Sequence, residues 1–240
     1  MTPSPQRTVW ANSAPGRLLI EASLWSADLG ALAAEIDRMQ PHADLFHLDA
    51  SDSRFVPEPL FFPALLAQLK PRTCVPFHVH LMACDPVAHV GRWIEAGADL
   101  ISVHLEAADV RHALAMIRDQ GKAGGLALRL DSDPTQILPL LDVVDVIVMV
   151  GTALGTKGTA MDPAAPRRIS AVRDLLTSQP AGRTVSVLAD GGIRTGTVSA
   201  LVAAGADGVV AGSLLFASSD PAQTAAWLHG HTGRARLAEQ

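Results

Sequence analysis

The chain has 240 residues, 48% of them hydrophobic, and a formal charge of −5 at pH 7 from 19 basic and 24 acidic residues. This length and hydrophobic content suffice for one large core and require no second domain. The sequence has no basic run and no Lys/Arg stripe interleaved with aromatic residues. Nucleic acid is therefore excluded as an expected partner, although a few local donors could still bind a small anion.

The first 16 residues contain three prolines and no apolar stretch long enough for a signal or membrane segment. We expect residues 1–16 to form a flexible N-terminal extension. The two cysteines, Cys74 and Cys84, flank an apolar run; if that run is a strand, the thiols lie too far apart for a disulfide. Free thiols without an export signal indicate a cytoplasmic protein that binds no membrane.

From Arg17 onward, short apolar runs alternate with longer amphipathic stretches. The runs expected to be strands are Leu18–Ser23, Leu45–Ala50, Phe77–Leu81, Leu100–Leu105, Leu126–Leu130, Val144–Val150, Val185–Leu188 and Gly208–Ala211. The expected helices include Leu29–Met39, Val87–Ala96, Val110–Gln120, Arg167–Thr177, Val198–Ala204 and Pro221–Leu228. Nearly continuous apolar runs are typical of parallel strands that are covered on both faces.

Eight strand–helix units favour a closed barrel over an open doubly wound sheet. The open sheet usually has fewer strands, and no GxGxxG motif follows the first strand here. A weak internal repeat, Glu95–Asp99 and Ala203–Asp207, supports repeated helix-to-strand turns with glycine at the helix end. We therefore predict an α/β fold, a single (β/α)8 TIM barrel over residues 17–232, followed by a C-terminal tail over 233–240.

Polar side chains stand at the ends of three expected strands, where the active sites of such barrels lie. His47 and Asp49 are two residues apart and so share one side of the second strand, His80 ends the third, and Asp190 ends the seventh. Each alone could be a core histidine or a turn aspartate, but a buried cluster of all four would be costly without a cation. The donor set suits Zn²⁺, Fe²⁺, Mn²⁺ or Co²⁺, and ligand type alone does not choose among them. We expect Zn²⁺ foremost.

Two further histidines accompany this set. His78 lies one pleat deeper than His80, and we expect it to support a ligand or to pack in the core. His104, at the end of the fourth strand, points into the same barrel mouth. Substrate contact, orientation of a ligand and simple packing all stay open for it.

Glycine-containing turns follow the seventh and eighth strands, where such barrels commonly bind phosphate on backbone N–H groups. Gly191 and Gly192 belong to the first turn, and Gly212 and Ser213 to the second, so we expect all four to contact a phosphate. The loop after the sixth strand, residues 151–158, is rich in small residues and is expected to cover the site. Its Lys157 is either an extra phosphate contact or a solvated lysine.

From about Leu18 to Phe216 the sequence resembles the ribulose-phosphate 3-epimerase family. The resemblance rests on Ala22–Asp28, on His47–Asp49 with Asp52 and Phe55–Pro57, and on Phe77–Met82, Ser102–Glu106 and Ala189–Gly192. It implies a metal-dependent isomerase that inverts the carbon next to the ketone of a ketose phosphate, ribulose 5-phosphate or a related sugar, through an enediolate. The family is often dimeric or hexameric, which implies a homo-oligomer.

The resemblance also implies roles for individual residues. His47, Asp49, His80 and Asp190 would be the metal ligands, and Asp49 and Asp190 would also move the proton. Ser23 and Met82 would then contact the substrate.

The departures from the family pattern surround the expected substrate. Ser51 stands where the family usually has methionine, Ser53-Arg54 where it has Gly-His, Val150 where it has methionine, Arg129 where it has asparagine, and Ala153–Gly158 where it has Asn-Pro-Gly-Phe-Gly-Gly. Because the four expected metal ligands are unchanged, we expect the same chemistry on an altered substrate. That substrate would be a different sugar phosphate, or one that carries another anionic group and meets Arg129 or Arg54 with it.

Two other classes of function stay open. A sugar-phosphate aldolase or decarboxylase on the same barrel would share the phosphate site, but it generally carries a lysine at a strand end, and no expected strand ends in one. A non-catalytic sugar-phosphate-binding barrel would not need two opposed carboxylates.

Overall fold

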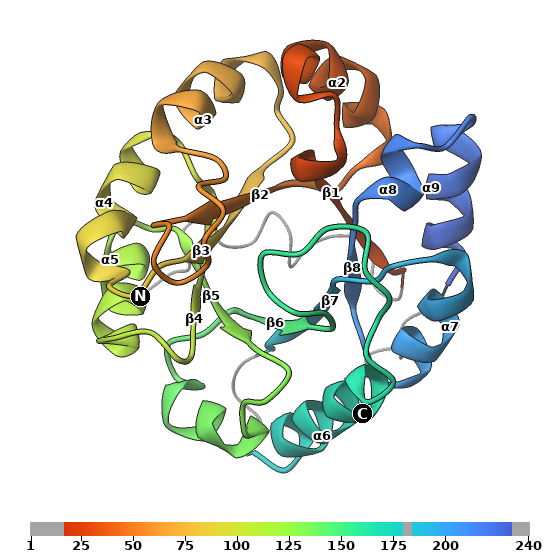
Figure 1. Ribbon diagram of the computed structural model, residues 1–240. Helices are drawn as coiled ribbons and strands as arrows, with labels where there is room; N and C mark the ends of the chain where they lie inside the picture. The colour runs from red at the N-terminus through yellow and green to blue at the C-terminus, as the bar shows by residue number, and fades with distance from the viewer. Residues whose placement is uncertain (1–16, 180–183, 232–240) are drawn as a thin grey trace.

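Eight parallel strands, hydrogen-bonded in chain order from β1 to β8 and back to β1, form a closed barrel in the computed structural model, which describes residues 17–179 and 184–231. Helices surround the barrel as an outer ring (Figure 1). This confirms the predicted (β/α)8 TIM barrel. The predicted N-terminal extension, 1–16, and C-terminal tail, 233–240, lie outside the described residues.

The strands begin and end close to the predicted positions, with one exception. They are β1 (Leu19–Ser23), β2 (Leu45–Ser51), β3 (Phe77–Met82), β4 (Leu100–His104), β5 (Ala123–Leu128), β6 (Val146–Val150), β7 (Ser186–Asp190) and β8 (Gly208–Ala211). The exception is β5, which begins three residues before the predicted start at Leu126. Gly124 and Gly125 conceal this start, because glycine is usually read as part of a loop.

The helices also follow the prediction, although some are short or of the 3-10 type. The α-helices are α2 (Leu32–Met39), α3 (Pro63–Leu69), α4 (Val87–Glu95), α5 (Val110–Asp119), α6 (Ala165–Thr177), α7 (Thr195–Ala203), α8 (Ser213–Phe216) and α9 (Pro221–His229). Between β5 and β6 the chain forms a 3-10 helix, η5 (Pro134–Leu140), in place of an α-helix. Pro139 inside it has no N–H to donate to an α-helical ladder.

Side chains alternate between the two faces of the strands. Outward residues such as Leu48 and Val79 pack against the helices in the main core. A second apolar cluster fills the inside of the barrel: Leu45, Leu100, Ala123, Ala127, Val146, Val148 and Leu188. Four of its members are the first residues of their strands, so apolar side chains close the N-terminal end of the barrel. The inward polar side chains His47, Asp49 and His80 lie beyond this cluster, toward the C-terminal ends of β2 and β3.

The two cysteines form no disulfide bond. Cys74, which is exposed, and Cys84, which is partly buried, are both free thiols, as expected. Within the described ranges, no helix is long and apolar enough to cross a membrane.

Gly125 fits against Ser102 so closely that we predict a large penalty for adding one methyl group. A Cβ at position 125 would lie 2.9 Å from Ser102 Cβ and 3.1 Å from its Cα. We expect Gly125→Ala to lower the free energy of unfolding by about 1–3 kcal/mol through overpacking. Urea denaturation followed by circular dichroism measures this effect.

Gly91→Ala is the matched control, because a Cβ at Gly91 in α4 would meet nothing within 4 Å. It should leave the stability unchanged or raise it by up to about 1 kcal/mol through helix propensity. Equal stability of the two variants would show that the close approach at Gly125 is unimportant.

Candidate active site

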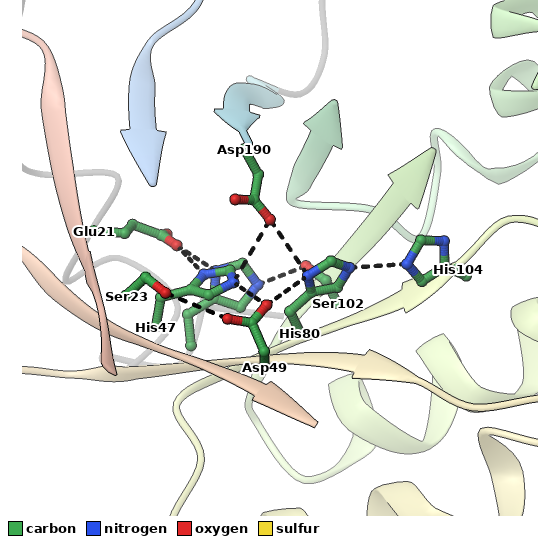
Figure 2. A network of polar contacts seen from close by, with 9 residues as sticks. Glu21, Ser23, His47, Asp49, His80, Ser102, His104 and Asp190 are labelled. Carbon is green, nitrogen blue, oxygen red and sulfur yellow. Dashed lines mark hydrogen bonds and ion pairs between the residues drawn. The ribbon is translucent and has the colours of Figure 1, made fainter. Parts of the chain in front are cut away.

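Four polar side chains converge at the C-terminal end of the barrel: His47 and Asp49 from β2, His80 from β3 and Asp190 from β7 (Figure 2). The parallel register pairs Asp49 directly with His80, and barrel closure brings Asp190 from the other side. One ligand atom from each of the four lies within 4.8 Å of the others. The structure thus brings together the four residues that the sequence analysis expected to meet.

The facing atoms of this cluster are spaced like ligands of a shared cation. His47 Nε2 lies 3.4 Å from Asp49 Oδ1 and 3.9 Å from Asp190 Oδ2. His80 Nδ1 lies 3.4 Å from Asp49 Oδ1 and 3.5 Å from Asp190 Oδ2. Good hydrogen bonds measure about 2.7–3.2 Å. Ligands placed about 2.0–2.1 Å from a tetrahedral ion lie about 3.3 Å apart, which is close to the observed spacing.

Two nitrogens of the cluster support the same conclusion. Among the described residues, neither His47 Nε2 nor His80 Nδ1 has a hydrogen-bond partner, although both are buried. A buried polar atom without a partner is costly, and a lone pair directed at a cation removes that cost. The residues present therefore fit a divalent metal ion.

The carboxylates and imidazoles of the cluster shift one another's pKa values strongly. Burial lowers the pKa of His47, but the carboxylates of Asp49, Glu21 and Asp190 together outweigh it and raise that pKa well above its ordinary value. Burial likewise lowers the pKa of His80, and Asp190 and Asp49 reverse this effect. Burial raises the pKa of Asp49, yet the two imidazoles bring it far below the usual range. The site thus attracts positive charge, and a cation would compete with protons for the imidazole nitrogens.

A second set of buried polar side chains, Glu21, His78 and Ser102, contacts the four-residue cluster through His47. Glu21 of β1, which is 1% exposed, lies 2.7 Å from Nδ1 of both His47 and His78. His78 Nε2 in turn lies 2.6 Å from Ser102 Oγ. Burial raises the pKa of Glu21, but His78 and His47 outweigh it and lower the pKa to about 2, so the carboxylate is ionised.

His78 does not join the four-residue cluster, which agrees with its expected supporting position. Glu21 was not among the site residues predicted from the sequence. Its signal was a lone charged residue inside the apolar run Leu18–Ala22.

His104 lies on the outer side of His80. Its Nε2 is 2.8 Å from His80 Nε2, and its Nδ1 is 3.0 Å from Glu106 Oε2. Burial lowers the pKa of His104 to about 4, which keeps its imidazole neutral. His104 does not line the pocket, so of the three roles left open the geometry favours orientation of His80.

The cluster opens into a pocket that reaches the two glycine-containing turns. Asp49, His80 and Asp190 line one part of it. The expected substrate and phosphate contacts also line it: Ser23, Met82, Gly191, Gly192, Gly212 and Ser213. Ser23 Oγ donates to Asp49 Oδ2 at 3.3 Å. The loop after β6 crosses the barrel mouth (Figure 1), and residues 152–159 of it face the pocket.

Gly191 and Gly192 have φ values of +89° and +68°, which other residues rarely adopt. A Cβ at Gly192 would lie 2.5 Å from the backbone nitrogen of Met161. Only glycine therefore permits this turn, in which Gly192 packs directly against the backbone of Met161.

Two cationic side chains line the pocket near these turns. Lys157 Nζ donates to the backbone oxygen of Trp25 at 2.6 Å. Arg194 donates to Ser213 Oγ and to the backbone oxygen of Gly158, both at 3.3 Å. Within the described residues their hydrogen-bond partners are neutral oxygens, so this end of the pocket carries positive charge and suits an anion. Arg194, like Glu21, was not predicted from the sequence to lie at the site.

The two arginines expected to meet an additional anionic group lie elsewhere. Arg129 places its guanidinium 5.7 Å from the ring centroid of Phe55 and does not line the pocket. Arg54 is exposed and does not line it either. Arg194 and Lys157, in contrast, are cationic side chains that do line the pocket.

The sequence of this chain is similar to those of known proteins. A family model described as "Ribulose-phosphate 3 epimerase family" matches residues 19–216. The ribulose-phosphate 3-epimerase of Synechocystis sp. is 32% identical over 214 residues, which cover 87% of this chain and 92% of that protein. The Bacillus subtilis protein of the same name is 30% identical and covers 84% of this chain and 93% of its own.

Solved structures with the same fold are more distant in sequence. The 3-hexulose-6-phosphate synthase of Salmonella typhimurium has a TM-score of 0.64 at 19% identity, covering 89% of this chain and 97% of that chain. A 3-keto-L-gulonate-6-phosphate decarboxylase of Vibrio cholerae has a TM-score of 0.67 at 14% identity, covering 91% and 99%. At such low identity these similarities show the fold alone.

The spacing of the four-residue cluster predicts that the full chain binds one equivalent of Co²⁺ or Zn²⁺ after dialysis against chelator. We expect His80→Asn to weaken this binding by about 100-fold or more, because it removes one of four ligands. A Co²⁺ titration followed by visible absorption measures the affinity. His112→Asn is the control, since His112 is exposed on α5. Equal Co²⁺ affinity of the two variants would contradict the assignment.

Proposed function

Because the chain belongs to the ribulose-phosphate 3-epimerase family, and is thus an isomerase acting on a ketose phosphate, we propose that two aspartates carry out its epimerisation. The observation that carries this proposal is the placement of Asp49 and Asp190. Figure 2 shows the two carboxylates approaching the imidazoles of His47 and His80 from opposite directions. Inversion of a carbon centre needs a base on one face and an acid on the other.

The proposed reaction begins with removal of a proton from the carbon next to the ketone. That hydrogen is only weakly acidic, so a base must be ionised and held close to it. The low pKa of Asp49 keeps this carboxylate ionised. Proton loss leaves an enediolate, and a proton delivered to the opposite face by the second aspartate gives the inverted sugar. The reverse reaction exchanges the roles of Asp49 and Asp190.

A divalent ion, Zn²⁺ foremost with Fe²⁺, Mn²⁺ or Co²⁺ as alternatives, would be held by His47, Asp49, His80 and Asp190. When bound, it would stabilise the negative charge that develops on the oxygens of the enediolate. The spacing of the four ligand atoms and the unpartnered imidazole nitrogens support this part of the proposal.

The phosphate of the substrate is proposed to occupy the other end of the pocket. Gly191, Gly192, Gly212 and Ser213 line that end, where backbone N–H groups commonly bind phosphate in such barrels. Arg194 and Lys157 add positive charge there.

Ribulose 5-phosphate is the substrate that the names of the relatives suggest. Val150 and the loop residues 153–158 line the pocket and differ from the family pattern, so we propose that they select a related ketose phosphate. Self-association, which the resemblance implies, also stays a proposal.

An aldolase or decarboxylase is the second candidate, because similar barrels include such enzymes by name. None of the eight described strands ends in a lysine, which disfavours this candidate. Epimerisation exchanges a proton with solvent without breaking a carbon–carbon bond, whereas both alternative reactions break one.

Asn substitution tests the two-aspartate mechanism. We expect Asp49→Asn and Asp190→Asn each to lower the epimerisation rate by about 10²–10⁴-fold, since each removes one proton-transfer group. Proton exchange in deuterated water, followed by NMR over ketose phosphates of four to seven carbons, measures it. Metal content is measured alongside, and the assays use saturating Co²⁺ because both residues are also proposed ligands.

Asp131→Asn is the control, because this carboxylate is exposed and lies outside the pocket. Near-normal exchange by Asp190→Asn would refute the two-aspartate mechanism. Carbon–carbon cleavage of any substrate in the panel would favour the second candidate.

Arg194→Gln tests the proposed phosphate end. Removing this positive charge should raise KM by about 10- to 100-fold with a smaller change in kcat, because the lost contact is a charge-assisted hydrogen bond far from the reacting carbon. Steady-state kinetics on the preferred ketose phosphate measures both constants. Arg129→Gln, outside the pocket, is the control. A larger effect from Arg129→Gln than from Arg194→Gln would overturn this placement of the phosphate.

A further inference from the structure

Glu21 is a buried charge that the proposed mechanism does not use. Its side chain is 1% exposed, and among the described residues its partners are two imidazoles and no lysine or arginine. A buried carboxylate is costly unless it is well hydrogen-bonded. His47 Nδ1 and His78 Nδ1 both lie 2.7 Å from the same oxygen, Glu21 Oε2, so this oxygen satisfies two histidines at once.

These distances identify hydrogen bonds and not a second metal ion. Glu21, His47 and His78 are close enough in space to hold a metal. Yet a separation of 2.7 Å is shorter than the spacing of about 3.3 Å expected between ligands of one tetrahedral ion. It lies within the usual range of charge-assisted hydrogen bonds, about 2.7–2.9 Å.

The direction of these hydrogen bonds determines where the imidazole protons lie. An ionised carboxylate only accepts, so His47 and His78 must each carry a proton on Nδ1. His78 Nε2 is then free to accept from Ser102 Oγ at 2.6 Å. His47 Nε2 faces the carboxylates of Asp49 and Asp190 at 3.4 and 3.9 Å, both too far for a charge-assisted hydrogen bond. A divalent ion at this point would replace a proton on His47 Nε2, and the spacing leaves room for it.

Glu21 is itself held in place from the opposite side. His78 connects it to Ser102 of β4, and Ser102 packs against Gly125 of β5. Both His78 and Ser102 are 0% exposed. The carboxylate is thus fixed by a buried series of contacts that runs through the barrel interior to His47.

We infer that Glu21 is a positioning residue of the metal centre, which holds the proton on His47 Nδ1 and so leaves Nε2 to bind the ion. This inference rests on the proposed function, since it requires a divalent ion at His47. Carboxylate partners of metal-binding histidines orient the ring and raise its basicity in the same way.

Glu21→Gln in the full chain tests the inference. The amide is a weaker acceptor, and its NH2 group must either face the Nδ1–H groups or take the buried place of Oε1, which has no partner among the described residues. We expect Co²⁺ affinity, measured by chelator competition, to fall by about 10- to 100-fold. The visible absorption of the Co²⁺-loaded variant should shift because the His47 ring is less firmly oriented.

Two controls separate this effect from a loss of stability. Ser102→Ala removes a buried hydrogen bond of the same series but leaves the contact between Glu21 and His47, so its Co²⁺ affinity should stay within about threefold of the parent. Glu35→Gln, which alters a glutamate paired with Arg38, should also leave it unchanged. An affinity of Glu21→Gln within threefold of the parent, or an equal loss in Ser102→Ala, would overturn the inference.

The parent chain provides a further test if Glu21→Gln does not fold. Nitrogen-15 NMR of the Zn²⁺-loaded protein should show a slowly exchanging proton on His47 Nδ1, and a proton on Nε2 instead would overturn the inference. A parent that binds no Co²⁺ or Zn²⁺ would refute the proposed metal site and the inference with it. If the parent chain binds Co²⁺ and Glu21→Gln binds it with the same affinity, the role of Glu21 would be refuted while the proposed metal site would stand.

Discussion

The pairing of β2 with β3 is the constraint on which the candidate site depends. Its parallel register sets His47 beside His78 and Asp49 beside His80, so one pair of strands supplies three of the four central groups. The fourth, Asp190, comes from β7 and reaches the others only because the sheet closes on itself. A shift of one residue between β2 and β3 would turn these side chains toward the helices and disperse the cluster.

The side chains inside the barrel are apolar at the N-terminal end and polar toward the C-terminal end. Apolar side chains close the N-terminal end. Glu21, His78 and Ser102 follow as a buried hydrogen-bonded group, and the two imidazoles and two carboxylates lie beside it, next to the pocket. The buried imidazole nitrogens without a partner in the described part of the chain both face the central cluster. Two unpartnered imidazole nitrogens that face the same point between two carboxylates indicate a binding position for a cation there.

Strong periodic signals made the barrel and the four central residues predictable, whereas isolated residues were not. His47, Asp49 and His80 share faces of apolar strands, and the period of two is enough to bring them together. Glu21 is a single charge in an apolar strand whose partners come from β2 and β3, so only tertiary contacts reveal its role. Arg129 follows β5 and packs over Phe55, and no local pattern distinguishes that position from one inside the pocket. The start of β5 was missed because Gly124 fits against Leu114 and Gly125 against Ser102, neighbours that are invisible along the chain.

The series Gly125–Ser102–His78–Glu21 links four different strands by direct contact. A larger residue at any one of its positions displaces the next, so these positions are not free to drift independently during evolution. Substitution at Gly125 would have to be accompanied by a smaller residue at 102, and loss of the acid at 21 by a new acceptor for His47. Among descendants of this chain, these four positions should therefore change as a set, even where the surrounding apolar residues are exchanged freely.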